Sequence, residues 1–189
     1  MINSGDGAGV GGQPEVEVTE SVTRGSSDSV DLLVAALQQV CDQRRMTLAV
    51  AESLTAGAIQ AAIGRHRGVS GFFLGGVVTY DIAVKAAVLG VDLDEAEPVD
   101  AVSDRVACQM AEGVRRLIGS DVGVAVTGWA EADVPHLVPF PRAAYAVAAP
   151  GLDEPTVGWV IGPGADRASM IEQVVVEVLQ AAIAVVTML

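Results

Sequence analysis

Hydrophobic and polar positions follow two different periods along this chain. Apolar residues recur every three or four positions in long stretches, which predicts helices, and short continuous apolar runs between them are typical of buried strands. The expected helices cover residues 28–45, 55–65, 82–89, 103–119 and 166–188. The expected strands cover residues 47–51, the latter half of 71–80, and residues 122–127, 143–149 and 156–161.

The order of these elements indicates the fold class. Helices alternate with strands along most of the chain, which is typical of α/β proteins. The last two strands are separated by a turn at residues 150–153, and this spacing predicts an antiparallel hairpin. We therefore expect an α/β sandwich with a mixed sheet.

The first part of the chain lacks a sustained apolar period. Residues 1–27 are rich in Gly, Ser, Glu and Val, and they contain four acidic residues but one basic residue, Arg24. Such a segment cannot bury enough apolar surface to pack, so we expect a disordered acidic extension that can be removed without loss of the fold. Residues 28–189 are expected to form one domain, a length that supports a real core.

Charge excludes some classes of partner. The 189 residues carry a formal net charge of -13, and the dense basic spots at residues 65–67 and 115–116 fall near expected helix ends. Phosphate-backbone binding needs a basic surface, so we expect no nucleic-acid partner. The most apolar tail, residues 181–189, is much shorter than the roughly 20 residues that span a bilayer. No signal peptide is evident, and we expect a soluble cytoplasmic protein without a membrane partner.

The two cysteines do not indicate a metal site. Cys41 and Cys108 lie far apart within expected helices, and neither has a partner at ligand spacing. We expect two buried free thiols and no metal.

The most informative stretch is Ala-Glu-Ser-Leu-Thr-Ala-Gly at residues 51–57, directly after the first strand. In α/β sheets, ligands bind at the carboxyl ends of the strands. There the Ser53 hydroxyl could face a ligand, and free N–H groups of the following helix could hold an anion or an oxyanion. The alternative is that Ser53 is simply the N-cap of that helix.

Tyr80 and Lys85 lie at the next strand end and one helical turn beyond it. If both strands end at one edge, Ser53, Tyr80 and Lys85 can converge. A desolvated lysine has a lowered pKa and can act as the base that a serine nucleophile needs. The alternative is that Lys85 is a surface helix residue and Tyr80 a strand-end aromatic residue.

Further motifs follow in a fixed order. Gly-Val-Val-Thr-Tyr ends at Tyr80 and is followed by Lys85; then come Ala-Val-Ser at 101–103, Met-Ala-Glu-Gly at 110–113, Val-Ala-Val-Thr-Gly at 124–128 and Asp-Arg at 166–167. Together with the serine motif, they resemble the C-terminal domain of CinA-type proteins. These are the competence-damage-inducible proteins and nicotinamide-nucleotide amidohydrolases. The resemblance runs from about Asp31 to the C-terminus.

This resemblance implies a three-layer α/β/α sandwich and the deamidation of nicotinamide mononucleotide to its nicotinate form, with release of ammonia and without a metal or organic cofactor. It implies that Ser53 is the nucleophile and that Tyr80 and Lys85 are its partners. Substrate contacts, and oxyanion donors near residues 54–56, are then expected from two loops that contain Leu54, Thr55, Ala56, Gly57, Thr127, Gly128 and Trp129. The partner is a small-molecule amide, and the resemblance also implies a homo-oligomer.

The chain departs from the family pattern after Gly128. Where the family has Ile-Ala-Gly-Pro-Gly-Gly, residues 129–134 read Trp-Ala-Glu-Ala-Asp-Val. Trp129 offers a flat face for stacking a ring, but Glu131 and Asp133 place carboxylates that would repel a phosphate where glycine backbone would approach a ligand. Two hypotheses therefore remain open: a serine amidohydrolase acting on nicotinamide mononucleotide or a related amide, and a non-catalytic relative that binds a small molecule or a protein.

Two smaller departures lie near the expected site. Leu54 and Ala56 replace the Cys and the first Gly of the family's serine motif, and the Asn and Glu that the family has between Tyr80 and Lys85 are missing. The expected catalytic residues are retained, whereas the loop expected to hold the ligand is altered.

Overall fold

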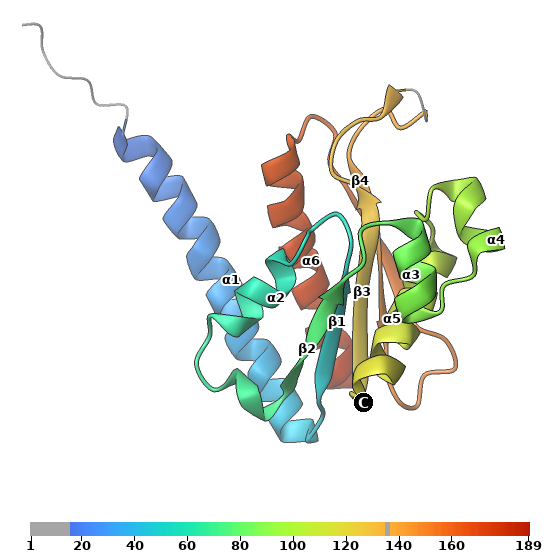
Figure 1. Ribbon diagram of the computed structural model, residues 1–189. Coiled ribbons are helices and arrows are strands. Elements are labelled where there is room, and N and C mark those ends of the chain that lie inside the picture. The colour runs from blue at the N-terminus through green and yellow to red at the C-terminus, as the bar shows by residue number, and fades with distance from the viewer. Residues whose placement is uncertain (1–15, 135–136) are drawn as a thin grey trace, which may run out of the picture.

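The computed structural model describes residues 16–134 and 137–189. A five-stranded sheet in the order β2-β1-β3-β4-β5 forms its centre (Figure 1). The strands are β1 (Leu48–Glu52), β2 (Phe73–Val78), β3 (Val122–Trp129), β4 (Arg142–Ala148) and β5 (Thr156–Ile161). The helices are α1 (Val16–Arg44), α2 (Ala58–Gly64), α3 (Ile82–Leu89), α4 (Leu93–Ala96), α5 (Asp104–Ile118) and α6 (Arg167–Met188).

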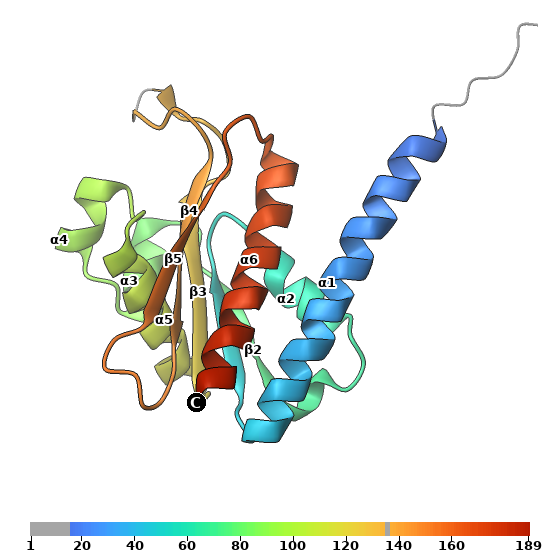
Figure 2. The ribbon, with the colours of Figure 1, turned by 180° about the vertical axis from the view of Figure 1, so that it is seen from behind.

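The sheet is mixed, as the sequence predicts. β1 pairs in parallel with β2 and β3, whereas β4 is antiparallel to both β3 and β5 (Figure 2). The carboxyl ends of β1, β2 and β3 therefore meet at one edge, and β4 begins at that same edge. This edge receives the loops that carry the candidate functional residues.

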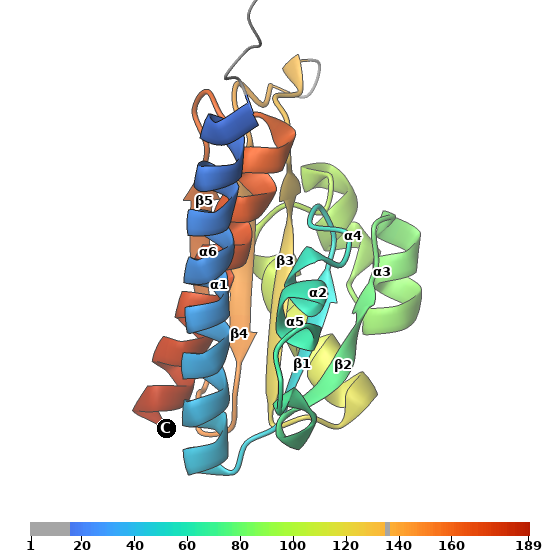
Figure 3. The same cartoon turned by 90° about the vertical axis from the view of Figure 1, so that its left-hand side faces the viewer.

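Helices cover both faces of the sheet and make three layers. Figure 3 shows α1 and α6 on one side of the strands and α3, α4 and α5 on the other. Val50 and Val124 point into the core under α1, α2 and α6, while Ala49 and Ala125 point into the core under α5. This alternation follows from the two-residue period of strands and confirms the predicted α/β/α sandwich.

Local capping signals determine several helix ends. The Asp81 carboxylate accepts hydrogen bonds from the N–H groups of Ala83 and Val84 at the start of α3, and the Ser103 hydroxyl accepts one from Val106 in α5. Gly90 and Gly119 end these helices in the left-handed region, with φ of 73° and 78°, as C-terminal glycines do. These boundaries confirm the sequence prediction.

Two helix boundaries differ from the prediction. α1 begins at Val16, twelve residues before the expected start at Asp28, and its first turns extend away from the sheet in Figures 1 and 2. Residues 1–15 of the expected extension lie outside the described part of the chain. α2 begins at Ala58 instead of Thr55, because residues 53–57 form a turn that reorients the chain between β1 and the helix.

α6 combines a core position with high apolarity. By length and composition alone it could cross a membrane, and it is the one helix in the described ranges that passes this test. Its buried side chains face the sheet and α1: Met170, Val174, Val175, Val178, Leu179, Ala182, Val185 and Val186. Packing in the core accounts for this apolar stripe.

The cysteines differ in burial. Cys41 on α1 is buried, and burial raises the pKa of its thiol to about 12. Cys108 on α5 is only partly buried. Both thiols are free, and the described residues contain no group of three or more His, Cys, Asp or Glu residues that could hold a metal ion.

Candidate active site

Ser53 and Lys85 meet at the carboxyl edge of the sheet. Ser53 directly follows β1 and is 5% exposed, and Lys85 lies on the first turn of α3 with 2% exposure. The Lys85 Nζ donates hydrogen bonds to the Ser53 Oγ at 3.0 Å and to the Tyr80 carbonyl oxygen at 2.8 Å. This geometry rules out the alternative in which Lys85 is a surface helix residue.

Lys85 is the only lysine in the chain, and its environment favours the neutral amine. Burial lowers the pKa of Lys85 from 10.5 to about 8, although the nearby carboxylates of Asp81 and Asp100 act in the opposite direction. With a pKa of about 8, roughly a tenth of the amine is unprotonated at neutral pH. A neutral amine beside a serine hydroxyl can accept its proton, so the pair has the composition of a nucleophile and its base.

Tyr80 occupies a different place from the one expected. Its side chain is 58% exposed, and it contacts Lys85 through its backbone carbonyl. Its hydroxyl accepts a hydrogen bond from the Arg167 Nη2 at 3.2 Å. In this arrangement the phenol does not stand between Ser53 and Lys85, so a proton relay through Tyr80 has no geometric support.

Glu52, the last residue of β1, occupies the N-terminus of α2. Its side chain is fully buried, and its carboxylate accepts hydrogen bonds from the N–H groups of Gly57, Ile59 and Gln60 at 2.9, 3.2 and 2.8 Å. The helix N-terminus is therefore already neutralised by a carboxylate, which corrects the expectation that its N–H groups face a ligand.

The alternative that Ser53 is the N-cap of α2 is also wrong. The N-cap of α2 is Gly57, which has no side-chain capping bond.

The turn after Ser53 leaves two backbone donors for an oxyanion. The Ala56 N–H donates to the Ser53 carbonyl, and the Ala58 N–H donates to the Thr55 carbonyl. Within the described ranges, the N–H groups of Leu54 and Thr55 donate to no protein acceptor. The expected set of oxyanion donors near residues 54–56 thus narrows to these two.

Side chains of the same turn differ in what they could contact. The Leu54 side chain is buried in the core, so only its backbone is available to a ligand. The hydroxyls of Thr55 and Thr79 are both buried, and neither has a hydrogen-bond partner among the described residues. Ala56 is exposed and has a φ of 50°, a left-handed conformation that glycine adopts more easily, and Gly57 follows with a φ of 104°.

Thr127, Gly128 and Trp129, expected in a loop, form the end of β3, and the side chains of Thr127 and Trp129 contact residues 100–101. The buried Thr127 hydroxyl donates to the Ala101 carbonyl at 2.7 Å, and the Trp129 Nε1–H donates to the Asp100 Oδ2 at 2.9 Å. Gly128 lies so close to β4 that a Cβ there would collide with the Arg142 carbonyl oxygen. Thr127 and Gly128 therefore have structural roles whether or not they contact a ligand.

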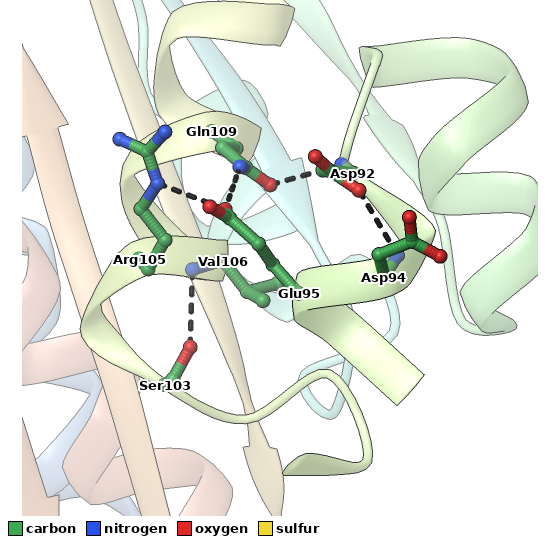
Figure 4. Close-up of polar contacts among 7 residues, drawn as sticks. All are labelled: Asp92, Asp94, Glu95, Ser103, Arg105, Val106 and Gln109. Carbon is green, nitrogen blue, oxygen red and sulfur yellow. Dashed lines mark hydrogen bonds and ion pairs between the residues drawn. The ribbon is translucent and has the colours of Figure 1, made fainter. Parts of the chain in front are cut away.

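Side-chain contacts bind α4, which precedes Asp100 in the chain, to α5. Glu95 accepts hydrogen bonds from the Arg105 Nε and the Gln109 Nε2, while Gln109 in turn accepts one from the Asp92 N–H (Figure 4). Beyond α4 the chain turns through Asp100 and Ala101, whose φ values of 50° and 55° are uncommon for residues other than glycine. The contacts of Thr127 with Ala101 and of Trp129 with Asp100 hold this strained turn in place.

Sequence reasoning did not identify Asp100, Arg142 or Arg167 as site residues. Arg142 lies 5.0 Å from the centre of the Trp129 ring and 6.0 Å from that of Trp159. The Asp166-Arg167 motif could have indicated Arg167 as a site residue. No local sequence pattern indicates Asp100 or Arg142, because the residues that contact them come from other elements.

The altered loop after Trp129 partly compensates its own charge. The Glu131 carboxylate forms an ion pair with Arg167 at 3.3 Å, and both side chains are largely exposed. Asp133 and Val138 form an isolated β-bridge in this loop. A pocket of about 430 Å³ lies between the loop and the start of α6, and its lining includes Glu131, Phe140 and Arg167.

The chain matches known proteins over most of this domain. The family model of the CinA C-terminal domain matches residues 31–186. A Desulforudis audaxviator protein named as competence-damage inducible is 47% identical over 91 residues, which are 48% of this chain and 22% of that protein. A CinA-like protein of Rippkaea orientalis is 42% identical over 104 residues, 55% of this chain and 24% of that protein. These matches thus span less than a quarter of the length of either relative.

A solved structure has the same fold. The competence-damaged protein (CinA) superfamily protein of Klebsiella pneumoniae superposes with a TM-score of 0.79 at 23% sequence identity. The match covers 85% of this chain and 99% of that chain. At this level of identity the likeness concerns the fold alone.

Proposed function

Because the chain belongs to the CinA C-terminal domain family, we propose that it is a serine amidohydrolase that deamidates nicotinamide mononucleotide or a related amide. The observation that carries this proposal is the hydrogen bond from the Lys85 Nζ to the Ser53 Oγ at 3.0 Å. A buried lysine with a pKa of about 8 beside a buried serine hydroxyl is a suitable base for such a nucleophile.

In the proposed reaction, the neutral amine of Lys85 accepts the Ser53 proton while the Ser53 Oγ attacks the carboxamide carbon. The N–H groups of Leu54 and Thr55 stabilise the developing oxyanion, since no other acceptor in the described residues uses them. The protonated Lys85 then donates its proton to the leaving nitrogen, and ammonia departs from an acyl-enzyme on Ser53.

Deacylation uses the same groups in the reverse order. Neutral Lys85 accepts one proton from the attacking water, whose oxygen adds to the acyl carbon, and passes this proton to the Ser53 Oγ as the acid product leaves. The acid then loses its remaining proton to solvent and becomes the carboxylate. No cofactor enters either half of this reaction. Tyr80 takes no proton in the scheme; its carbonyl holds the Lys85 amine, and its hydroxyl receives Arg167. The proposal includes a cytoplasmic homo-oligomer, by resemblance to the family.

The second candidate is a non-catalytic module that binds a small molecule or a protein. The observation that favours it is the loop after Trp129, where Glu131 and Asp133 stand in place of the family's glycines. A retained serine and lysine can persist in a binding site without turnover.

Ammonia release distinguishes the two candidates. Wild-type protein is incubated with nicotinamide mononucleotide and with unphosphorylated amides, and ammonia is measured against Ser53→Ala and Lys85→Met. Ser120→Ala is a matched control, because Ser120 is a buried serine whose hydroxyl donates to the Val122 carbonyl outside this site. Release that needs Ser53 and Lys85 but not Ser120 supports the amidohydrolase, whereas binding without release by the wild type supports the module.

A further inference from the structure

Arg142 lies between the two tryptophans of the chain. It is the first residue of β4 and pairs across the sheet with Trp129 on β3, while Trp159 lies on β5. Its guanidinium carbon is 5.0 Å from the centre of the Trp129 ring and 6.0 Å from that of Trp159. Two aromatic faces attract a guanidinium and restrict its orientation, so its edge, where the N–H donors lie, is left for other partners.

This guanidinium has no acidic partner in the described part of the chain. The chain contains 24 acidic residues and 11 basic ones, and Arg105, Arg116 and Arg167 all form ion pairs. Arg142 is half-buried, and its Nε is buried without an acceptor. A buried guanidinium N–H without an acceptor costs free energy, which an acceptor from a bound ligand would offset.

The two carboxylates that contact the tryptophans accept hydrogen bonds from the indole rings. The Trp129 Nε1–H donates to Asp100, and the Trp159 Nε1–H donates to the Asp104 Oδ1 at 2.6 Å. Each aspartate thereby fixes the ring of one tryptophan instead of pairing with Arg142. Asp100 and Asp104 therefore hold the two rings in place and leave the Arg142 guanidinium without an acidic partner among the described residues.

The site lies on the same face of the sheet as Ser53. Ala144, two residues after Arg142, packs under α5 together with Ala51, two residues before Ser53. β4 lies two strands away from β1 in the sheet. Ala51 lies opposite Ala125, so Ser53 is level with Thr127, and Arg142 lies opposite Trp129, two residues further along β3. Two strand spacings of about 4.8 Å and a two-residue step of about 7 Å along the strands separate the backbone of Arg142 from that of Ser53 by roughly 12 Å.

We propose that Arg142, clamped between Trp129 and Trp159, binds an oxyanion of the substrate, a phosphate or a carboxylate, while the amide of the same substrate reaches Ser53. The proposal rests on the proposed amidohydrolase function and adds a substrate class to it: an amide whose anionic group lies roughly 12 Å from its carboxamide. A guanidinium held by its two faces presents parallel N–H donors, which suit bidentate binding of an oxyanion.

Intrinsic fluorescence tests the binding step without any turnover. Because Trp129 and Trp159 are the only tryptophans, their emission reports on this site alone. Inorganic phosphate and sodium acetate are titrated at constant ionic strength, with sodium chloride as the reference salt. We expect a saturable change with at least one anion, about tenfold weaker or lost in Arg142→Met and intermediate in Arg142→Lys. Arg116→Met makes the same charge change on α5 and should bind as the wild type does.

The two anions distinguish the source of the oxyanion, since a response to phosphate alone indicates a phosphate ester and a response to acetate alone a carboxylate. Circular dichroism and the melting temperature establish that each variant is folded. A wild type without a saturable response to either anion, or folded Arg142→Met and Arg142→Lys variants that bind as tightly as the wild type, would overturn the proposal.

A matched substrate pair separates this inference from the proposed function. Nicotinamide mononucleotide and nicotinamide riboside differ by the phosphate alone. If the subsite is right, Arg142→Met raises the KM of the phosphorylated amide about tenfold or more, and Ser53→Ala abolishes turnover but keeps anion binding. If the protein binds anions through Arg142 but hydrolyses no amide, the proposed function is wrong and the anion subsite stands. If hydrolysis depends on Ser53 but anion binding does not depend on Arg142, the anion subsite alone is wrong.

Discussion

The Nζ of Lys85 lies 3.0 Å from the Oγ of Ser53, although the two residues are 32 positions apart in the chain. Their contact depends on the parallel pairing of β1 and β2, which brings the serine turn and the start of α3 to one edge. The chain's only lysine is thus buried against a serine hydroxyl instead of lying in solvent, where lysines are usually found.

We expect the activity to rise with pH through the Lys85 titration. The neutral amine is the base, and burial lowers the pKa of Lys85 to about 8. Below that value, kcat/KM for an uncharged amide should fall about tenfold per pH unit, and above it kcat/KM should level off. The rate profile checks this, and protein labelled with ¹³C-lysine gives a single side-chain NMR signal for Lys85. An NMR pKa near 10.5 would contradict the assignment.

The same shift predicts a stability effect that needs no turnover. Between pH 8 and 10.5 the unfolded chain binds a proton at Lys85 that the folded protein has released, so the free energy of unfolding should rise with pH across this window. The gain is at most about 3 kcal/mol. Urea unfolding at both ends of the window measures it, and Lys85→Met should remove this part of the pH dependence.

Glu52→Ala should strongly destabilise the fold. The substitution removes a buried carboxylate that accepts three backbone N–H groups at the start of α2, and these donors would be left unsatisfied. We expect the free energy of unfolding to fall by about 3 kcal/mol or more, with a smaller loss for Glu52→Gln, which keeps one acceptor oxygen. Glu112→Ala, in an exposed ion pair on α5, should change it by less than about 1 kcal/mol. Equal losses in the two alanine variants would contradict the capping role.

Ala56→Gly should be neutral or stabilising by up to about 1 kcal/mol. Ala56 has a φ of 50°, and relief of this left-handed strain offsets the greater freedom that glycine gives the unfolded chain. The matched control is Ala61→Gly, at an exposed helical position of α2, which should cost about 1 kcal/mol. Thermal melts of both variants check the difference, and similar losses at the two positions would show that Ala56 is unstrained.

Removal of residues 1–27 should leave the domain folded. α1 begins at Val16, and among its residues from Asp28 onward, whose side chains the structure describes, Val34, Leu37 and Cys41 are fully buried. We expect the melting temperature to change by no more than a few degrees. A longer deletion of residues 1–37 also removes two buried aliphatic side chains, each worth about 2 kcal/mol, and should unfold the protein or nearly so. A large loss from the short deletion would show that residues 1–27 pack on the domain.

Glu131→Gly with Asp133→Gly should improve turnover of nicotinamide mononucleotide. The change removes two negative charges and frees Arg167 from its ion pair with Glu131, and a partly desolvated charge pair is worth several kcal/mol at most. We expect about a tenfold rise in kcat/KM for the phosphorylated amide and none for nicotinamide riboside. Glu131→Gln with Asp133→Asn isolates the charge from the backbone freedom of glycine. Unchanged kinetics in both double variants would show that these carboxylates do not repel the substrate.

Much of the fold could be predicted because its signals are local. The caps at Asp81 and Ser103 depend on side chains that reach N–H groups two or three positions onward, and Gly119 ends α5 through its own backbone freedom. Continuous apolar runs such as β3 reflect burial on both faces, which any compact packing of this chain requires. The contact between Ser53 and Lys85 could also be predicted from the sequence, because both residues follow strands that end at one edge of a parallel sheet.

What the sequence could not determine depends on contacts between distant elements. The hydrogen bonds of Glu52 at the start of α2 depend on the turn at residues 53–57, and Asp100 contacts Trp129, 29 positions further along the chain. Arg142 meets Trp129 and Trp159 only through the register of β4 with its two neighbours, where a shift of one residue would move its side chain to the other face. The sequence by itself determined the elements and their caps, since those depend on neighbours within a few positions. The tertiary structure decided the surroundings of Ser53, because strand register and helix docking are set by the packing of the whole core.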